Sequence, residues 1–144
     1  MSPELRQAFE ETNYIVDHKP PFTLNIGQAC PALNELLQEG GHEAAAFITA
    51  WNPFSQPLTE TENSVRQRSL IADVQGQGLN WIPGVGQHSN NHWPGEESIF
   101  IIGMDLDAAR DLATKYGQWA FVWAPKDGLP KLISLQRKSK SKTL

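Results

Sequence analysis

Residues 44–51 are AAAFITAW, a nearly continuous apolar run with His42 and Glu43 before it and Asn52 after it. The run is short enough for a strand and shorter than an ordinary buried helix. A strand without polar alternation is typically covered on both faces. This stretch therefore predicts a central, buried strand in a β-sheet.

Outward from this run, further apolar or alternating stretches predict strands at 14–16, 22–26, 79–83, 98–103, 119–124 and 132–135. Periodicity and capping residues predict helices at 3–12, from Cys30-Pro31 to Gly40-Gly41, from Thr59 or Thr61 to Gly76, and from Asp105 or Asp107 to Gly117. Residues 84–97, rich in Gly, Asn, His and Ser, are predicted to form a loop. This order of elements predicts an α+β fold with one mixed β-sheet and helices packed on it.

The composition fits one globular domain over residues 1–136, because the chain has 144 residues with 40% hydrophobic and 19% charged side chains. The net charge is −4, yet Arg137, Lys138, Lys140 and Lys142 fall in the last eight residues, so the rest carries −8. We expect the tail 137–144 to be disordered and solvated. Its alternative role is a weak handle for nucleic acid, which the acidic body opposes.

No apolar run approaches the length of a membrane span, and the start MSPELRQAFEE lacks the charged and apolar regions of a secretory signal. The single cysteine, Cys30, excludes an internal disulfide framework. We therefore expect a cytoplasmic protein without membrane contact. The GVG at 84–86 is not a dinucleotide fingerprint, and no cofactor is predicted.

Residues 47–69, FITAWNPFSQPLTETENSVRQRS, carry the strand into a dense set of polar side chains. Glu62 and Arg66 lie four residues apart on one helix face. One interpretation is a surface ion pair worth about 0.3–0.5 kcal/mol. The other is that Glu62 holds Arg66 toward a carboxylate or phosphate, with Asn52 and Ser55 adding hydrogen bonds from the strand end.

Residues 84–98, GVGQHSNNHWPGEES, contain His88 and His92 followed by Glu96 and Glu97. A Gly/Asn loop would hold such metal ligands poorly, so no metal site is predicted. A long lid anchored by Trp93, Glu96 and Ser98 is one interpretation, with Glu96 as a general base if burial raises its pKa. The other is that Trp93 is a hydrophobic plug and Glu96 a strand-end charge.

Four segments together, TAWNPFS, TENSVRQRSL, HWPGEESIFIIGM and YGQWAFVWA, resemble the bacterial domain-of-unknown-function family 3293 over roughly residues 43–135. The resemblance implies a shared set of polar positions: Thr49, Asn52, Pro53, Ser55, Glu62, Asn63, Arg66, Trp93, Glu96, Ser98 and Gln118. Gly95 and Trp119 depart from the pattern and change the shape of any pocket there.

These positions predict a pocket, provided that strands 44–51 and 98–103 are neighbours. The catalytic candidates are Glu62 and Glu96, and the ligand-binding candidates are Thr49, Asn52, Ser55, Asn63, Arg66, Trp93, Ser98 and Gln118. The arginine suggests a small anionic ligand, such as a nucleotide or phosphodiester. The competing hypothesis is a non-enzymatic module that contacts a protein partner, marked by a flat apolar patch around Trp81 and Trp93.

Overall fold

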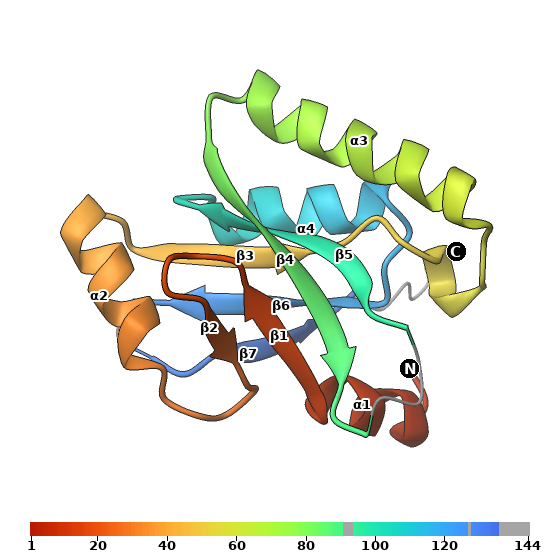
Figure 1. The fold of residues 1–144 in the computed structure, drawn as a ribbon, viewed down its shortest axis with the longest axis horizontal. Coiled ribbons are helices and arrows are strands. Elements are labelled where there is room, and N and C mark those ends of the chain that lie inside the picture. The colour runs from red at the N-terminus through yellow and green to blue at the C-terminus, as the bar shows by residue number, and fades with distance from the viewer. Residues whose placement is uncertain (91–93, 127, 136–144) are drawn as a thin grey trace, which may run out of the picture.

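The computed structural model describes residues 1–90, 94–126 and 128–135. Its elements follow the order expected from the sequence and form one α+β domain (Figure 1). They are α1 (Pro3–Glu10), β1 (Thr12–Val16), β2 (Phe22–Leu24), α2 (Pro31–Gly40), β3 (Ala44–Ile48), a tight turn (Pro53–Ser55), α3 (Glu60–Gly76), β4 (Asn80–His88), β5 (Glu96–Ile102), α4 (Leu106–Lys115), β6 (Ala120–Pro125) and β7 (Lys131–Ser134). The predicted basic tail lies outside the described residues.

The seven strands form one sheet in the order β2-β1-β4-β5-β3-β6-β7, and every pairing is antiparallel. The expectation of a mixed sheet is therefore corrected. Helix α3 links β3 to β4, and α4 links β5 to β6. The two strands that each helix joins run in the same direction. In both cases an antiparallel strand lies between the linked strands, which leaves no parallel neighbours.

Strand β3 is the centre of the sheet, as its apolar sequence predicts. It pairs with β5 on one side and β6 on the other, and all five of its residues are buried. Ala45 and Ala46 point to opposite faces of the sheet, and both are fully buried. The expected contact between the strands around 44–51 and 98–103 is confirmed by the pairing of Phe47 with Phe100.

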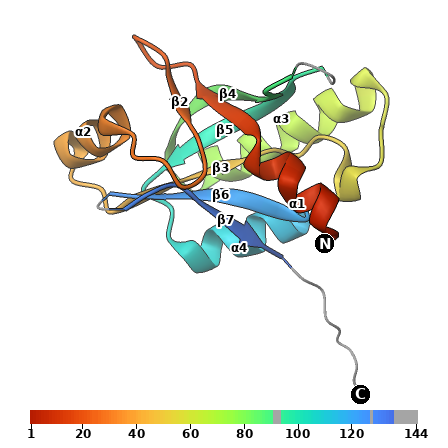
Figure 2. The ribbon, with the colours of Figure 1, turned by 90° about the horizontal axis from the view of Figure 1, so that it is seen from below.

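Each face of the sheet has its own hydrophobic core. On one face, Leu70 and Val74 of α3 and Leu112 of α4 pack against Ile99 and Ile101 of β5. On the other face, α2 packs its buried side chains against β1, β3 and β6. Helices α1 and α2 lie toward opposite ends of this second face (Figures 1 and 2). The sheet curls so far that the Gly27 amide, after β2, donates to the Pro130 carbonyl, before β7, at 2.9 Å.

Strand β4 corrects the prediction that residues 84–97 form a loop, because it continues to His88 and β5 already begins at Glu96. Glycines hide the strand pattern here, since they offer no side chain to alternate. A Cβ at Gly84 would lie 2.6 Å from the Ile15 carbonyl oxygen and 2.7 Å from the Phe47 ring. Glycine is thus required for close packing rather than for mobility. Trp93 and His92 lie outside the described residues.

None of the described helices is long and apolar enough to cross a membrane.

Candidate functional site

The segment that leaves β3 has an unusual backbone. Asn52, Phe54 and Ser55 have φ angles of 45°, 54° and 60°, a region that residues with side chains seldom adopt. The Phe54 amide donates to the Gly117 carbonyl at 2.7 Å, and the Ser55 amide donates to the Asn52 carbonyl at 2.9 Å. Local strain of this kind persists only where the surrounding structure enforces it, and it often marks a functional segment.

Asn52 is fixed by Asn63, which is 2% exposed. The Asn63 amide nitrogen donates to Oδ1 of Asn52 at 2.8 Å, and Oδ1 of Asn63 accepts from the Asn52 backbone at 2.8 Å. The Leu58 backbone also donates to Oδ1 of Asn52, at 3.0 Å. Because two donors occupy this oxygen, the Asn52 side-chain nitrogen must point the other way.

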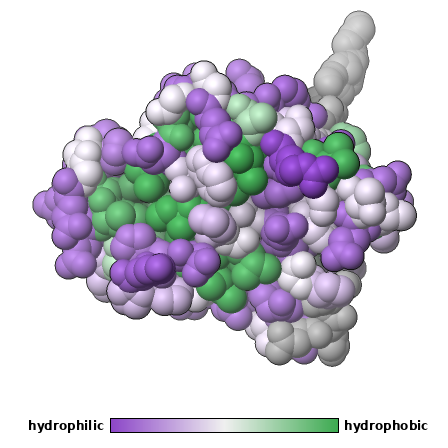
Figure 3. All heavy atoms as spheres, turned by 45° about the horizontal axis from the view of Figure 1, so that its top comes forward, coloured by the Kyte–Doolittle hydropathy of each residue, from purple (hydrophilic) through white to green (hydrophobic). Residues whose placement is uncertain are grey.

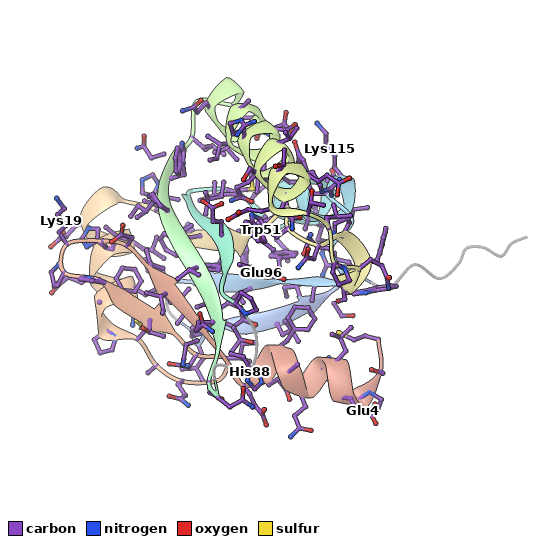
Figure 4. All side chains as sticks on the ribbon, turned by 45° about the vertical axis from the view of Figure 1, so that its right-hand side comes forward. Glu4, Lys19, Trp51, His88, Glu96 and Lys115 are labelled. Carbon is purple, nitrogen blue, oxygen red and sulfur yellow. The ribbon has the colours of Figure 1, made fainter. Side chains whose placement is uncertain are left out.

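That nitrogen points at Glu96, and donates to its Oε2 at 3.0 Å. The carboxyl of Glu96 is partly buried at the first residue of β5, and no other described residue donates to it. Burial raises the pKa of Glu96, and the hydrogen bond from Asn52 offsets part of that increase. Glu96 lies in the interior below Trp51, whereas Glu4, Lys19 and Lys115 lie at the periphery (Figure 4).

Arg66 differs from its prediction. It donates from Nε to the Ala50 carbonyl at 2.9 Å and from Nη2 to the Tyr116 carbonyl at 2.5 Å. The guanidinium therefore joins the end of β3 to the end of α4. The expected pairing, in which Glu62 holds Arg66, is wrong, because two backbone carbonyls hold the guanidinium instead. These contacts use two of its five N–H donors, and the expected contact of Arg66 with a ligand stays a prediction.

Glu62 turns away from Arg66 and toward the start of α3. Its Oε1 accepts from the backbone and the hydroxyl of Thr59, both at 3.0 Å, while the Thr59 hydroxyl accepts from the Glu62 amide. This reciprocal arrangement is a capping box. The hydrogen bonds from Thr59 lower the pKa of Glu62. The predicted ion pair is absent from the described residues, and Glu62 has a helix-capping role.

Gln67 and Gln118 complete the polar contacts behind the strand end. Oε1 of Gln67 accepts from the Ala50 amide at 3.1 Å. The Gln118 side chain donates to the carbonyls of Trp51 and Tyr116 at 3.1 and 3.2 Å. Gln67 was missed from the sequence because, inside a helix, a buried glutamine carries no signal that separates it from an exposed one.

A cavity of about 340 Å³ opens on the other side of Asn52, between α1 and the sheet. Its floor is one face of the sheet, to which every second residue of each strand points. The floor residues are Tyr14, Gly86, Ser98, Thr49 and Val122. Leu5, Ala8 and Phe9 of α1 line the side opposite this floor. None of the α1 side chains is fully buried, so this helix covers the end of the sheet without filling it.

Six predicted site residues line this cavity: Thr49, Asn52, Ser55, Glu96, Ser98 and Gln118. Glu62, Asn63 and Arg66 do not line it, and Trp93 lies outside the described residues. The Thr49 hydroxyl donates to the Glu97 carbonyl, and the Ser98 hydroxyl donates to the Glu96 carbonyl at 3.1 Å. Glu96 is therefore the charged side chain of this set, and its carboxyl accepts one hydrogen bond from the described residues.

Tyr14 and His88 also line the cavity, and sequence reasoning did not select them for it. The Tyr14 hydroxyl donates to the Phe9 carbonyl at 2.6 Å, which ties α1 to β1. Burial raises the pKa of Tyr14 further from neutrality, and the charge of Glu96 adds to the effect. His88 is 8% exposed and its Nε2 lies 3.2 Å from Oε1 of Glu11. Only the register of β1 and β4 brings these residues together.

Within residues 1–90, 94–126 and 128–135, no three His, Cys, Asp or Glu side chains gather closely enough to hold a metal ion. His88 and Glu96 both line the cavity, but His88 contacts Glu11 and Asn90 instead of pairing with Glu96 in the described structure. The chemistry of the site therefore depends on one carboxyl, a few hydroxyl and amide groups, and apolar walls.

The chain belongs to the family described as "Protein of unknown function (DUF3293)", whose match covers residues 48–121. That range includes the end of β3, the strained turn, α3, the β4–β5 pair, α4 and the start of β6. No curated protein and no solved structure matches the chain.

Proposed function

We propose that the protein binds a small organic molecule in the cavity between α1 and the sheet, with Glu96 as the polar group that orients it. The observation that carries this proposal is a partly buried carboxyl, held by Asn52, at the wall of an otherwise mostly apolar cavity. A volume of about 340 Å³ lies in the range of small-molecule sites. The setting we propose is the cytoplasm, which the single cysteine favours.

The cavity wall favours a different ligand from the nucleotide or phosphodiester expected from the sequence. No Lys or Arg occurs among the described lining residues, and Arg66 is held by carbonyls behind the strand end. Glu96 would repel a phosphate placed beside it. A ligand that donates a hydrogen bond to Glu96 and buries an apolar body fits these walls better.

Glu96 is also the better of the two catalytic candidates. A carboxyl whose pKa is raised by burial is suited to accept a proton near neutral pH. Glu62 is an exposed capping residue on α3 and does not line the cavity. Of these two candidates, we therefore assign proton transfer in this cavity to Glu96, in addition to its role in binding.

The competing protein-interaction module gains less support from the surface. Among the described large apolar side chains, the exposed ones are Phe54, Val65 and Leu129, which lie on separate segments. Trp81 is half-buried and packs against the core under α3. Hydrophobic residues on the face shown in Figure 3 lie in separate patches between hydrophilic residues. A broad docking patch would require a continuous apolar surface.

A cavity-filling substitution tests the binding proposal. A Cβ at Gly86 would meet its nearest neighbour, Thr12, at 3.7 Å, so Gly86→Ala is tolerated and Gly86→Leu projects into the cavity. Compounds from a library of small apolar amines, alcohols and acids are added to ¹⁵N-labelled protein and amide shifts are recorded. We expect some compounds to shift the amide resonances of Ser98 and Gly86 in the wild type. The same compounds should shift the Ser98 amide in Gly86→Ala and should not bind Gly86→Leu. Equal binding to Gly86→Leu, or shifts confined to α3, would contradict the proposal.

A further inference from the structure

The cavity has an aromatic wall around a single carboxyl. Five aromatic residues occur in its lining, Phe9, Tyr14, Phe47, Trp119 and Phe121, of which Phe121 packs its ring in the core on the α3 and α4 side. They come from α1, β1, β3 and the β6 region, so rings lie on several sides of the space. Tyr14 and Phe47 contact edge to face, with ring centroids 5.4 Å apart.

This combination has a definite electrostatic preference. The face of an aromatic ring is negative, and it attracts a cation within about 6 Å of its centre. A carboxylate removed from water is costly unless a cation or several donors compensate it. Glu96 receives one described donor, the Asn52 amide, and no described Lys or Arg lines the cavity. A positive group would satisfy both the carboxylate and the rings.

The other titratable groups in the lining do not supply that positive charge to Glu96. Tyr14 is a neutral phenol that donates to Phe9, and burial keeps it neutral. His88 contacts Glu11 and Asn90 at the end of β4. Among the described residues, none supplies this compensation, so we assign it to the bound molecule.

We infer that the ligand is an organic amine, with an ammonium group that pairs with Glu96 and an apolar or aromatic body packed against the rings. This inference rests on the proposed function, because it names the class of molecule that the same cavity binds. It replaces the anionic ligand suggested by Arg66 with a cationic one. No covalent step is needed for it.

The test compares probes that differ in charge and little in shape. 2-Phenylethylamine, 2-phenylethanol and phenylacetate supply a cation, a neutral group and an anion on one aromatic skeleton. The cyclohexyl analogues repeat the series without a ring quadrupole. Dissociation constants are measured at pH 7 and constant ionic strength from the amide shifts of Ser98 and Gly86, in wild type, Glu96→Gln and Glu97→Gln.

Glu97→Gln is the matched control, because Glu97 is exposed, adjacent in sequence and outside the cavity lining, and the variant has the same net charge as Glu96→Gln. We expect the amine to bind wild type about tenfold or more tighter than the alcohol and the acid. Glu96→Gln should weaken the binding of the amine about tenfold and leave the dissociation constant of the alcohol unchanged. Glu97→Gln should match wild type for all three probes.

The outcomes separate this inference from the proposal beneath it. If cavity amides shift but the alcohol or acid binds as tightly as the amine, the inference is overturned and the binding site stands. The same holds if Glu96→Gln retains the full amine affinity. If none of the six probes shifts the cavity amides at millimolar concentration, while Gly86→Leu and Gly86→Ala behave alike with the whole library, both statements are overturned.

Discussion

The polar residues on the two sides of the strand end at Ala50 and Asn52 differ in how their side chains are bound. On the α3 side, Asn63, Arg66 and Gln67 bind backbone groups of the strand end with their side chains. On the cavity side, Glu96 is paired with one amide and borders open space. The first set fixes the strained segment, and the second remains available to a ligand. The difference shows that polar density alone does not identify a site.

Arg66→Ala has the largest expected effect, and it tests whether the α3 side is part of the scaffold. It removes charged donors from the Ala50 and Tyr116 carbonyls, so we expect unfolding free energy to fall by about 2–3 kcal/mol. Arg66→Lys should recover only part, because an ammonium does not reproduce the planar fork of the guanidinium. The measurement is urea unfolding followed by tryptophan fluorescence.

Arg68→Ala is the matched control, since Arg68 is exposed on the same helix. It should change the unfolding free energy by less than about 0.5 kcal/mol. Equal stability of the Arg66 and Arg68 variants would show that Arg66 is not part of the scaffold.

A second prediction uses two glycines of β4 on the same face as the cavity floor. Gly84→Ala places a Cβ 2.6 Å from a backbone oxygen and 2.7 Å from Phe47, so it should cost about 1–3 kcal/mol through overpacking. Gly86→Ala meets nothing closer than 3.7 Å and should be within about 0.5 kcal/mol of wild type. Thermal unfolding of both variants checks this. Two equally stable variants would restore the flexible-loop interpretation of residues 84–88.

A third prediction concerns the start of α3, which positions Asn63 and Arg66. Thr59→Ala removes the hydroxyl that accepts from the Glu62 amide, and should cost about 1 kcal/mol. Thr61→Ala, inside the same first turn, should be neutral or slightly stabilising because alanine favours helix. Chemical unfolding of the pair distinguishes them, and an equal loss in both would argue against the capping role.

The smallest expected effect has the opposite sign, and it sharpens the contrast between scaffold and site. Burial favours the neutral form of Glu96 and so raises its pKa above the unfolded value. Its contribution to stability is thus most favourable below the unfolded pKa and is lost as pH rises through the folded pKa. Glu96→Gln, which keeps an acceptor for Asn52, should be more stable than wild type at pH 7 by less than about 1 kcal/mol.

This advantage should shrink as the pH is lowered through the folded pKa of Glu96, because the wild-type carboxyl is then neutral as well. Thermal unfolding of both proteins between pH 4 and pH 7 gives the comparison, with Glu97→Gln as the control for net charge. A difference that is independent of pH would mean that ionised Glu96 does not oppose folding.

Most of the secondary structure was predictable from the sequence because its causes are local. The buried run at 44–48, the capping residues of α3 and the apolar run of β5 each follow from side chains a few residues apart. The prediction was wrong at residues 84–88, where Gly84 is set by Phe47 and by the Ile15 carbonyl, both distant in sequence. The mixed sheet was wrong for a similar reason, since strand order depends on which strands lie between the two ends of each helical crossover.

The sequence by itself determined which residue types gather near the end of β3, and it selected six residues that line the cavity. Only the tertiary structure decided their roles. Arg66 and Glu62 have a helical spacing that suits an ion pair, but Arg66 meets the carbonyl of Tyr116, 50 residues away, and Glu62 meets Thr59. The fold decides which donors and acceptors lie beside a charged side chain. Glu96 keeps acceptor positions for a ligand because, among the described residues, Asn52 is its one donor.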